Sequence, residues 1–90
     1  MVRTSLETSF SEVWLEGEIS NLRAPGSGHL YCTLKDQTSQ IRAVIFRSTA
    51  LRLRFGLEDG LHVIVRGRLS VYEPRGEYQL ILDHVEPRGL

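Results

Sequence analysis

The feature that most constrains the fold is a pair of alternating segments joined by a short polar turn. Residues 30–35 and 40–46 place apolar side chains at every second position, and residues 36–39 (DQTS) separate them. A period of two is typical of a strand with one buried and one accessible face. The pattern therefore predicts a β-hairpin whose accessible face carries Tyr31, Lys35 and Arg42. A ring and two cations suit stacking on bases and neutralising phosphates, so this face is either a binding site or ordinary solvated surface.

The other segments predict the rest of a small barrel. Alternation predicts further strands over Val13–Leu22, Leu61–Tyr72 and Tyr78–Val85, and Gly17 and Gly67 within them suit the bends that close a barrel. Residues 47–54 have helical spacing with Ser48 as the N-cap, which predicts a helix of two to three turns ending near Gly56. Together these elements predict an all-β, five-stranded Greek-key barrel with one short helix between strands three and four, plugging the open end. An open β-sandwich is the alternative, and it would not need a helix at that place.

Length and composition set outer limits. Ninety residues allow one small domain with a single core. We assign residues 11–90 to the barrel and residues 1–10 to an N-terminal segment that is either a helical turn or partly vector-derived. No apolar run approaches the ~20 residues that cross a bilayer, and no signal peptide is expected. The one cysteine, Cys32, cannot form an internal disulfide and falls on a buried face, which indicates a core residue in a reducing compartment.

Charge is balanced overall but unevenly distributed. The chain carries 11 basic and 11 acidic residues, yet the only acid within residues 23–54 is Asp36, against five arginines and one lysine. Such a segment either forms a local positive patch or scatters its charges over different faces. No Ser–His–acid grouping, metal-ligand cluster or phosphate-binding glycine loop is present, so no catalytic site, metal or cofactor is expected in this chain.

Several short runs together resemble one known family. The runs EGEISNL, GHLY, LKD, VRGRLS and YEPRGEYQL resemble the N-terminal OB-fold domain of the exodeoxyribonuclease VII large subunit family, over about Phe10 to Gly89. More distantly, the chain is similar to the anticodon-binding OB domains of class II aminoacyl-tRNA synthetases. The resemblance implies a bacterial cytoplasmic exonuclease, a hydrolase that degrades single-stranded DNA to acid-soluble oligonucleotides together with copies of a small subunit. Its catalytic region would lie outside this domain, so the chain would hold the strand without cleaving it.

The resemblance also implies where a strand would bind. OB folds bind single strands across strands two and three, between the first–second and fourth–fifth loops. The expected platform is Tyr31, Thr33, Lys35 and Arg42, with Val44 as a further candidate. We expect Tyr31 to stack on a base, and Arg42 to contact the backbone or stack. The expected rims are Arg23, Ser27 and His29 on one side and Tyr72, Arg75 and Tyr78 on the other.

A second interpretation assigns the chain to assembly. Trp14 falls on the outward face of its strand, where it would stack a base, pack under the N-terminal segment or enter a partner interface. Together with Ile64, Leu22 and the zero net charge, it favours a module that docks on the catalytic region, on small subunits or on a second copy of itself. A free-standing enzyme is the least favoured alternative.

Overall fold

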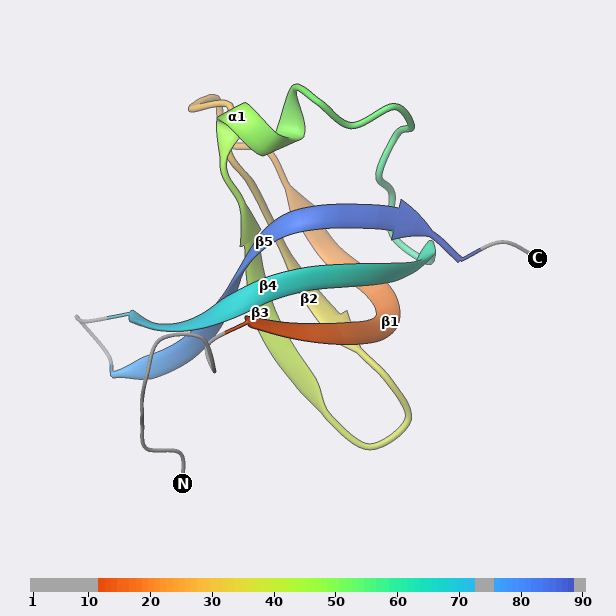
Figure 1. Ribbon diagram of the computed structural model, residues 1–90, viewed down its shortest axis with the longest axis vertical. Coiled ribbons are helices and arrows are strands. Elements are labelled where there is room, and N and C mark those ends of the chain that lie inside the picture. The colour runs from red at the N-terminus through yellow and green to blue at the C-terminus, as the bar shows by residue number, and fades with distance from the viewer. Residues whose placement is uncertain (1–11, 73–75, 89–90) are drawn as a thin grey trace.

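Five strands and one short helix form a closed barrel in this computed structural model, which describes residues 12–72 and 76–88 (Figure 1). The elements are β1 (Glu12–Arg23), β2 (Leu30–Lys35), β3 (Gln40–Ile45), α1 (Arg47–Ala50), β4 (His62–Tyr72) and β5 (Glu77–Pro87). The predicted all-β barrel is confirmed, and each strand begins and ends within two residues of its prediction. The segment expected over residues 1–10 lies outside the described residues.

Strand β1 closes the barrel because it pairs with two different strands. Residues 12–18 pair antiparallel with β4, and residues 18–23 pair antiparallel with β2. At the changeover lies Gly17, which is buried, and a Cβ there would lie 2.9 Å from the carbonyl oxygen of Lys35. Only glycine lets the two backbones approach this closely. The barrel order β1-β2-β3-β5-β4 is completed by β3, which pairs parallel with β5.

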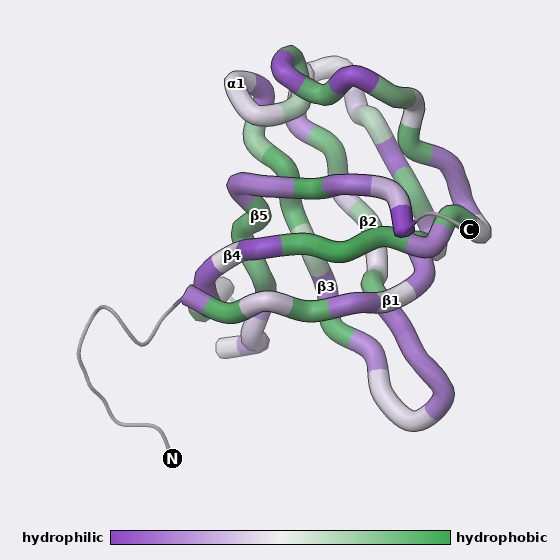
Figure 2. The backbone as a smooth tube through the Cα atoms, turned by 45° about the vertical axis from the view of Figure 1, so that its right-hand side comes forward, coloured by the Kyte–Doolittle hydropathy of each residue, from purple (hydrophilic) through white to green (hydrophobic). Residues whose placement is uncertain are grey.

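The barrel interior is filled by aliphatic side chains from all five strands. The largest fully buried members of the core are Ile19, Ile45, Val63, Val65, Leu80 and Leu82. Apolar positions recur along the strands in Figure 2, whereas the turn between β2 and β3 is hydrophilic. Within the described ranges, no helix has the length and apolar character needed to span a bilayer.

The helix after β3 is shorter than predicted. α1 is a single turn, its N-cap is Phe46 with no side-chain cap, and the assignment of Ser48 as N-cap is therefore wrong. In residues 51–57, after α1, the side chains that pack against the core are Leu53, Phe55 and Leu57, which are two residues apart. That spacing suits an extended path over the barrel end better than a helix. The expected cover for the barrel end exists, but one helical turn and an irregular segment form it.

Strand β5 contains a bulge opposite Gly67. Arg66 pairs with His84 and Gly67 with Leu82, so Asp83 is an extra residue on β5. The bulge lets both Leu82 and Val85 face the core. It also brings the backbone so close that a Cβ on Gly67 would lie 2.5 Å from the carbonyl oxygen of Ile81.

This close approach predicts that Gly67→Ala destabilises the barrel. Backbone must move to admit the methyl group, and overpacking of this kind costs about 1–3 kcal/mol. Gly56→Ala is the matched control, because a Cβ there meets nothing within 4 Å. Urea unfolding of both variants measures the difference. Equal free energies of unfolding for Gly67→Ala and Gly56→Ala would show that the bulge is not this tightly packed.

Candidate nucleic-acid interface

The outer face of β2 and β3 places the predicted platform residues in register. β2 and β3 pair antiparallel, with Tyr31 opposite Val44, Thr33 opposite Arg42 and Lys35 opposite Gln40. Tyr31, Thr33 and Lys35 are partly buried, and Arg42 is exposed. The hairpin therefore presents a ring, a hydroxyl group and a guanidinium group on one face.

Val44 does not belong to an accessible platform. Only 3% of its surface is exposed, because the β2–β3 and β3–β5 registers place it between Tyr31 and Ile81. Neighbours on both adjacent strands cover its short side chain. The expectation that Val44 contacts a ligand is therefore wrong.

A groove joins the platform to the start of β5. It has a volume of about 380 Å³, and its lining includes Thr33, Arg42, Glu77 and Tyr78. Tyr78 is 67% exposed, so a second aromatic ring is available beside the platform. The structure thus brings together three predicted site residues, Thr33, Arg42 and Tyr78.

The groove also contains a residue that the sequence analysis did not select. Glu77 Oε1 lies 3.1 Å from Arg42 Nη2, which makes an ion pair across β3 and β5. The sequence places Glu77 in a turn far from Arg42. Only the parallel pairing of β3 with β5 brings the two side chains together.

The loop between β1 and β2 is held by local hydrogen bonds. Ser27 Oγ accepts the backbone N–H of His29 at 3.2 Å, and His29 Nδ1 accepts the backbone N–H of Arg47 at 2.8 Å. The His29 ring also packs against Phe46, with centroids 5.2 Å apart. His29 therefore fixes the loop to the start of α1, a structural contact that the sequence analysis did not predict.

Arg23 lies next to the platform, at the end of β1. A bulge between Ser20 and Arg23 shifts the register, and Asn21 within it has a φ of 54°. As a result, exposed Arg23 pairs with Tyr31 of β2. On the opposite rim, Tyr72 ends β4, but its side chain and all of Arg75 lie outside the described residues.

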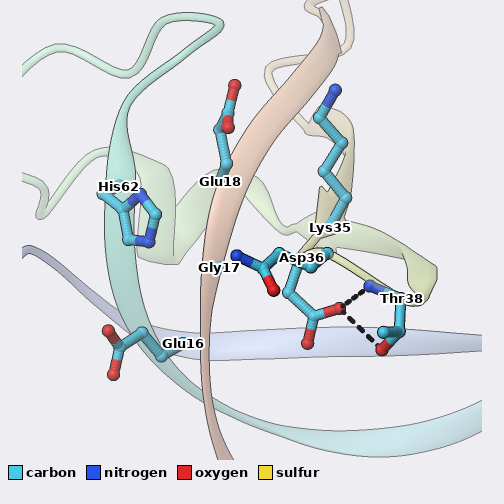
Figure 3. Close-up of a pocket in the computed structure, with 8 residues that line it drawn as sticks. Glu16, Gly17, Glu18, Lys35, Asp36, Thr38 and His62 are labelled. Atoms are coloured by element: carbon cyan, nitrogen blue, oxygen red, sulfur yellow. Dashed lines mark hydrogen bonds between the residues drawn. The ribbon is translucent and has the colours of Figure 1, made fainter.

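Lys35 borders a different hollow. It does not line the 380 Å³ groove, but lines a cavity of about 610 Å³ between β1 and the β2–β3 turn (Figure 3). The acidic side chains of that cavity are Glu16, Glu18 and Asp36, which make it a poor site for phosphate. No group of three or more potential metal ligands occurs in residues 12–72 and 76–88. Lys35 therefore lies among carboxylates at the far end of the platform, paired with Gln40 across β2 and β3, and is not part of the groove lining.

The turn that joins the two platform strands is fixed by Asp36. Its Oδ1 accepts the backbone N–H groups of Thr38 at 2.9 Å and Ser39 at 3.0 Å. These two bonds, chiefly the one from Thr38, lower the pKa of the Asp36 carboxyl below 3.8. The turn stabilises the register in which Thr33 faces Arg42.

Cys32 is part of the core beneath the platform. Its side chain is 3% exposed, and burial raises the pKa of the thiol to about 11, with a smaller contribution from nearby Asp59. The thiol is therefore protonated at neutral pH and is a poor nucleophile. The predicted core role of Cys32 is confirmed.

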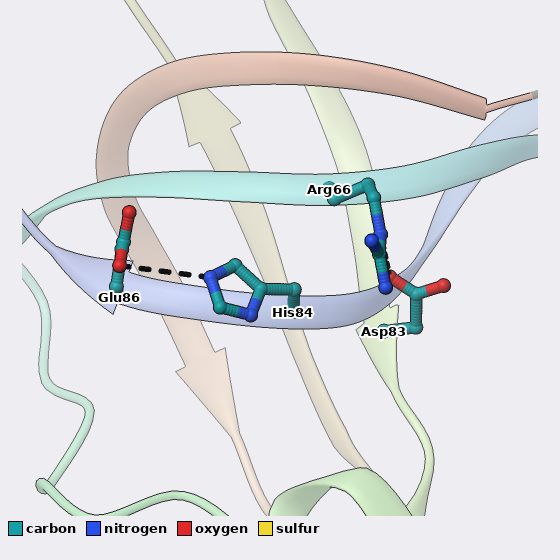
Figure 4. A network of polar contacts seen from close by, with 4 residues as sticks. All are labelled: Arg66, Asp83, His84 and Glu86. Carbon is teal, nitrogen blue, oxygen red and sulfur yellow. Dashed lines mark hydrogen bonds and ion pairs between the residues drawn. The ribbon is translucent and has the colours of Figure 1, made fainter.

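A second aromatic surface lies on β1, β4 and β5, away from the groove. Trp14 is 58% exposed, the Arg66 guanidinium lies 5.7 Å from its ring centroid, and the His84 ring packs edge-on at 5.6 Å. A carboxylate lies beside each of these two side chains. Asp83 lies 2.8 Å from Arg66 and Glu86 lies 3.6 Å from His84 (Figure 4). Trp14 thus sits on a surface where Asp83 offsets the charge of the neighbouring Arg66 guanidinium.

Comparison with known proteins decides the family. A family model described as an OB-fold nucleic acid binding domain matches residues 1–86. The chain belongs to this family. It is 57% identical over 90 residues to the exodeoxyribonuclease 7 large subunit of Geotalea uraniireducens and 61% identical over 87 residues to that of Azotobacter vinelandii. These matches cover 100% and 97% of the chain but only 20% and 19% of the relatives, so the chain spans about a fifth of their length.

Two solved structures share the fold. A replication protein A heterotrimer bound to ssDNA matches 89% of this chain and 59% of its own, with a TM-score of 0.72 and 14% identity. The asparaginyl-tRNA synthetase of Pyrococcus horikoshii matches 84% of this chain and 19% of its own, with a TM-score of 0.67 and 20% identity. At these identities the likeness shows the OB fold alone.

The Asp36 bonds predict a pH-dependent stability. Asp36→Ala should lower the melting temperature at pH 7, because two turn N–H groups lose their acceptor. Since the pKa is lowered on folding, the stabilisation is present above 3.8 and is lost as the pH falls through the folded-state value. The melting curves of wild type and variant should therefore converge at low pH. Asp36→Asn keeps an acceptor oxygen, so its melting temperature at pH 7 should fall less than that of Asp36→Ala. A difference in melting temperature between wild type and Asp36→Ala that stays constant at every pH would contradict this explanation.

Proposed function

We propose that this chain is the single-stranded-DNA-binding domain of an exodeoxyribonuclease VII large subunit. The observation that carries the proposal is the groove in which Thr33, Arg42 and Tyr78 meet, on the strands that OB folds use for single strands. Two further findings support the same function. The chain belongs to a family of OB-fold nucleic acid binding domains, and its sequence is 57% identical to an exodeoxyribonuclease 7 large subunit.

The proposed binding mode assigns each group one role. Tyr31 and Tyr78 offer rings on which bases stack, and each stacked base contributes about 1–3 kcal/mol. Thr33 offers a hydroxyl hydrogen bond, and the guanidinium groups of Arg42 and Arg23 neutralise phosphates. These interactions read no particular base, which suits a protein that accepts many sequences. Ser27, His29, Lys35, Tyr72 and Arg75 remain predicted rim or platform residues.

The proposed parent protein is a cytoplasmic hydrolase that degrades single-stranded DNA to acid-soluble oligonucleotides. Its catalytic region would lie in the remaining four-fifths of the length of the relatives, and its small subunits would bind outside this domain. With few rings and cations, the domain by itself would bind weakly. If the domain is linked to further DNA-binding sites in the parent protein, the combined affinity for the strand would be much higher than that of this domain alone.

A second candidate function is assembly, which Trp14 favours. A half-exposed tryptophan framed by Arg66 and His84 has the composition of a protein-interface hot spot. In this case the domain would dock on the catalytic region, on small subunits or on its own copy. Sedimentation with and without oligonucleotide separates the two functions, since a stable dimer that is indifferent to DNA would favour assembly.

Substitutions on the platform should weaken binding to oligo-dT. In fluorescence anisotropy, Tyr31→Ala should raise Kd by about 5- to 140-fold, the equivalent of one lost stacked base. Arg42→Ala should weaken binding less and flatten its dependence on salt. Trp14→Ala is the matched control, because it removes an exposed ring away from the groove. If Tyr31→Ala and Arg42→Ala both bind as wild type does, the platform is wrongly assigned.

A further inference from the structure

The central cation of the groove already has an anionic partner. The Arg42 guanidinium and the Glu77 carboxylate are 3.1 Å apart, and their side chains are 46% and 45% exposed. Thr33 and Tyr78 line the same groove. A phosphate that entered the groove to reach Arg42 would also meet the negative charge of Glu77. The two anions would compete for one guanidinium group.

The fold itself fixes the position of Glu77. The parallel pairing of β3 with β5 sets Arg42 opposite Gln79. Glu77 is two residues earlier on β5, so alternation places it on the same face as Gln79. It is the first residue of β5 and follows Gly76, which takes a φ of 64°. The ion pair is thus a consequence of strand register, as well as of side-chain position.

We propose that Glu77 is an internal competitor of the DNA strand, which a phosphate must displace from Arg42 on binding. The inference rests on the proposed function and adds to it a residue that limits affinity. Ion pairs this exposed are weak, so a phosphate can displace the carboxylate. Because the Glu77 carboxylate stays beside the bound phosphate, it offsets part of the charge of Arg42, and the salt dependence should be shallower than the number of cations suggests.

Two isosteric variants on one strand test the proposal. Glu77→Gln keeps the shape of the side chain and removes its charge. Glu86→Gln makes the same charge change roughly 30 Å further along β5, beside His84. With oligo-dT, Glu77→Gln should bind about 1.5- to 5-fold more tightly than wild type. Its plot of log K against log salt should be steeper than that of wild type, by less than the ~0.7 that one whole phosphate contact gives on a single strand, because Arg42 already contacts the phosphate in wild type.

A double variant distinguishes displacement from general repulsion. In an Arg42→Gln background, Glu77→Gln should lose most of its effect on Kd and on the salt slope, because no guanidinium group is left to release. An equal gain in both backgrounds would overturn the proposal. The proposal would also be overturned if wild type binds oligo-dT but Glu77→Gln binds it no more tightly than Glu86→Gln does. The proposed function would stand in that case. If neither wild type nor Glu77→Gln binds oligo-dT, the proposed function fails as well.

Discussion

The barrel depends on the pairing of one strand, β1, with two neighbours. β1 pairs with β4 in its first half and with β2 in its second, and Gly17 at the changeover allows the backbone of Lys35 to approach. This closure brings β5 against β3, where no hairpin connects them. The groove follows from that contact, since Arg42 comes from β3 while Glu77 and Tyr78 come from β5. A stable closed barrel is therefore the condition for the candidate site.

Much of the fold could be predicted because alternation fixes strands and their buried faces. The structure of the segment that covers the barrel end could not be predicted, because the apolar residues in 51–57 fit two different periods. Leu51 and Phe55 suggest a helix, whereas Leu53, Phe55 and Leu57 suggest an extended path, and packing against the barrel selects the second. The bulge at Asp83 could not be predicted from the sequence either, since it is defined only by the pairing of β5 with β4.

The candidate site could be predicted only in part. Alternation places Tyr31, Thr33 and Arg42 on one face, but it does not show which neighbours cover a side chain. Val44 is therefore a candidate from the sequence alone, although Tyr31 and Ile81 flank it in the sheet. Glu77 could not be predicted as a site residue, because the parallel pairing of two strands that are distant in the sequence leaves no local sequence pattern. His29 was expected on a rim, and its bond to the backbone of Arg47 depends on how the loop meets α1.

The central claim is that single-stranded DNA lies across β2 and β3 and into the groove at β5. Its most direct test is a two-dimensional NMR titration of this chain with short oligo-dT. The account predicts that the amide shifts of Tyr31, Thr33, Arg42 and Tyr78 move together and saturate, while those of Trp14, Arg66 and His84 stay in place. Shifts confined to the surface around Trp14, or no shifts at all, would contradict it.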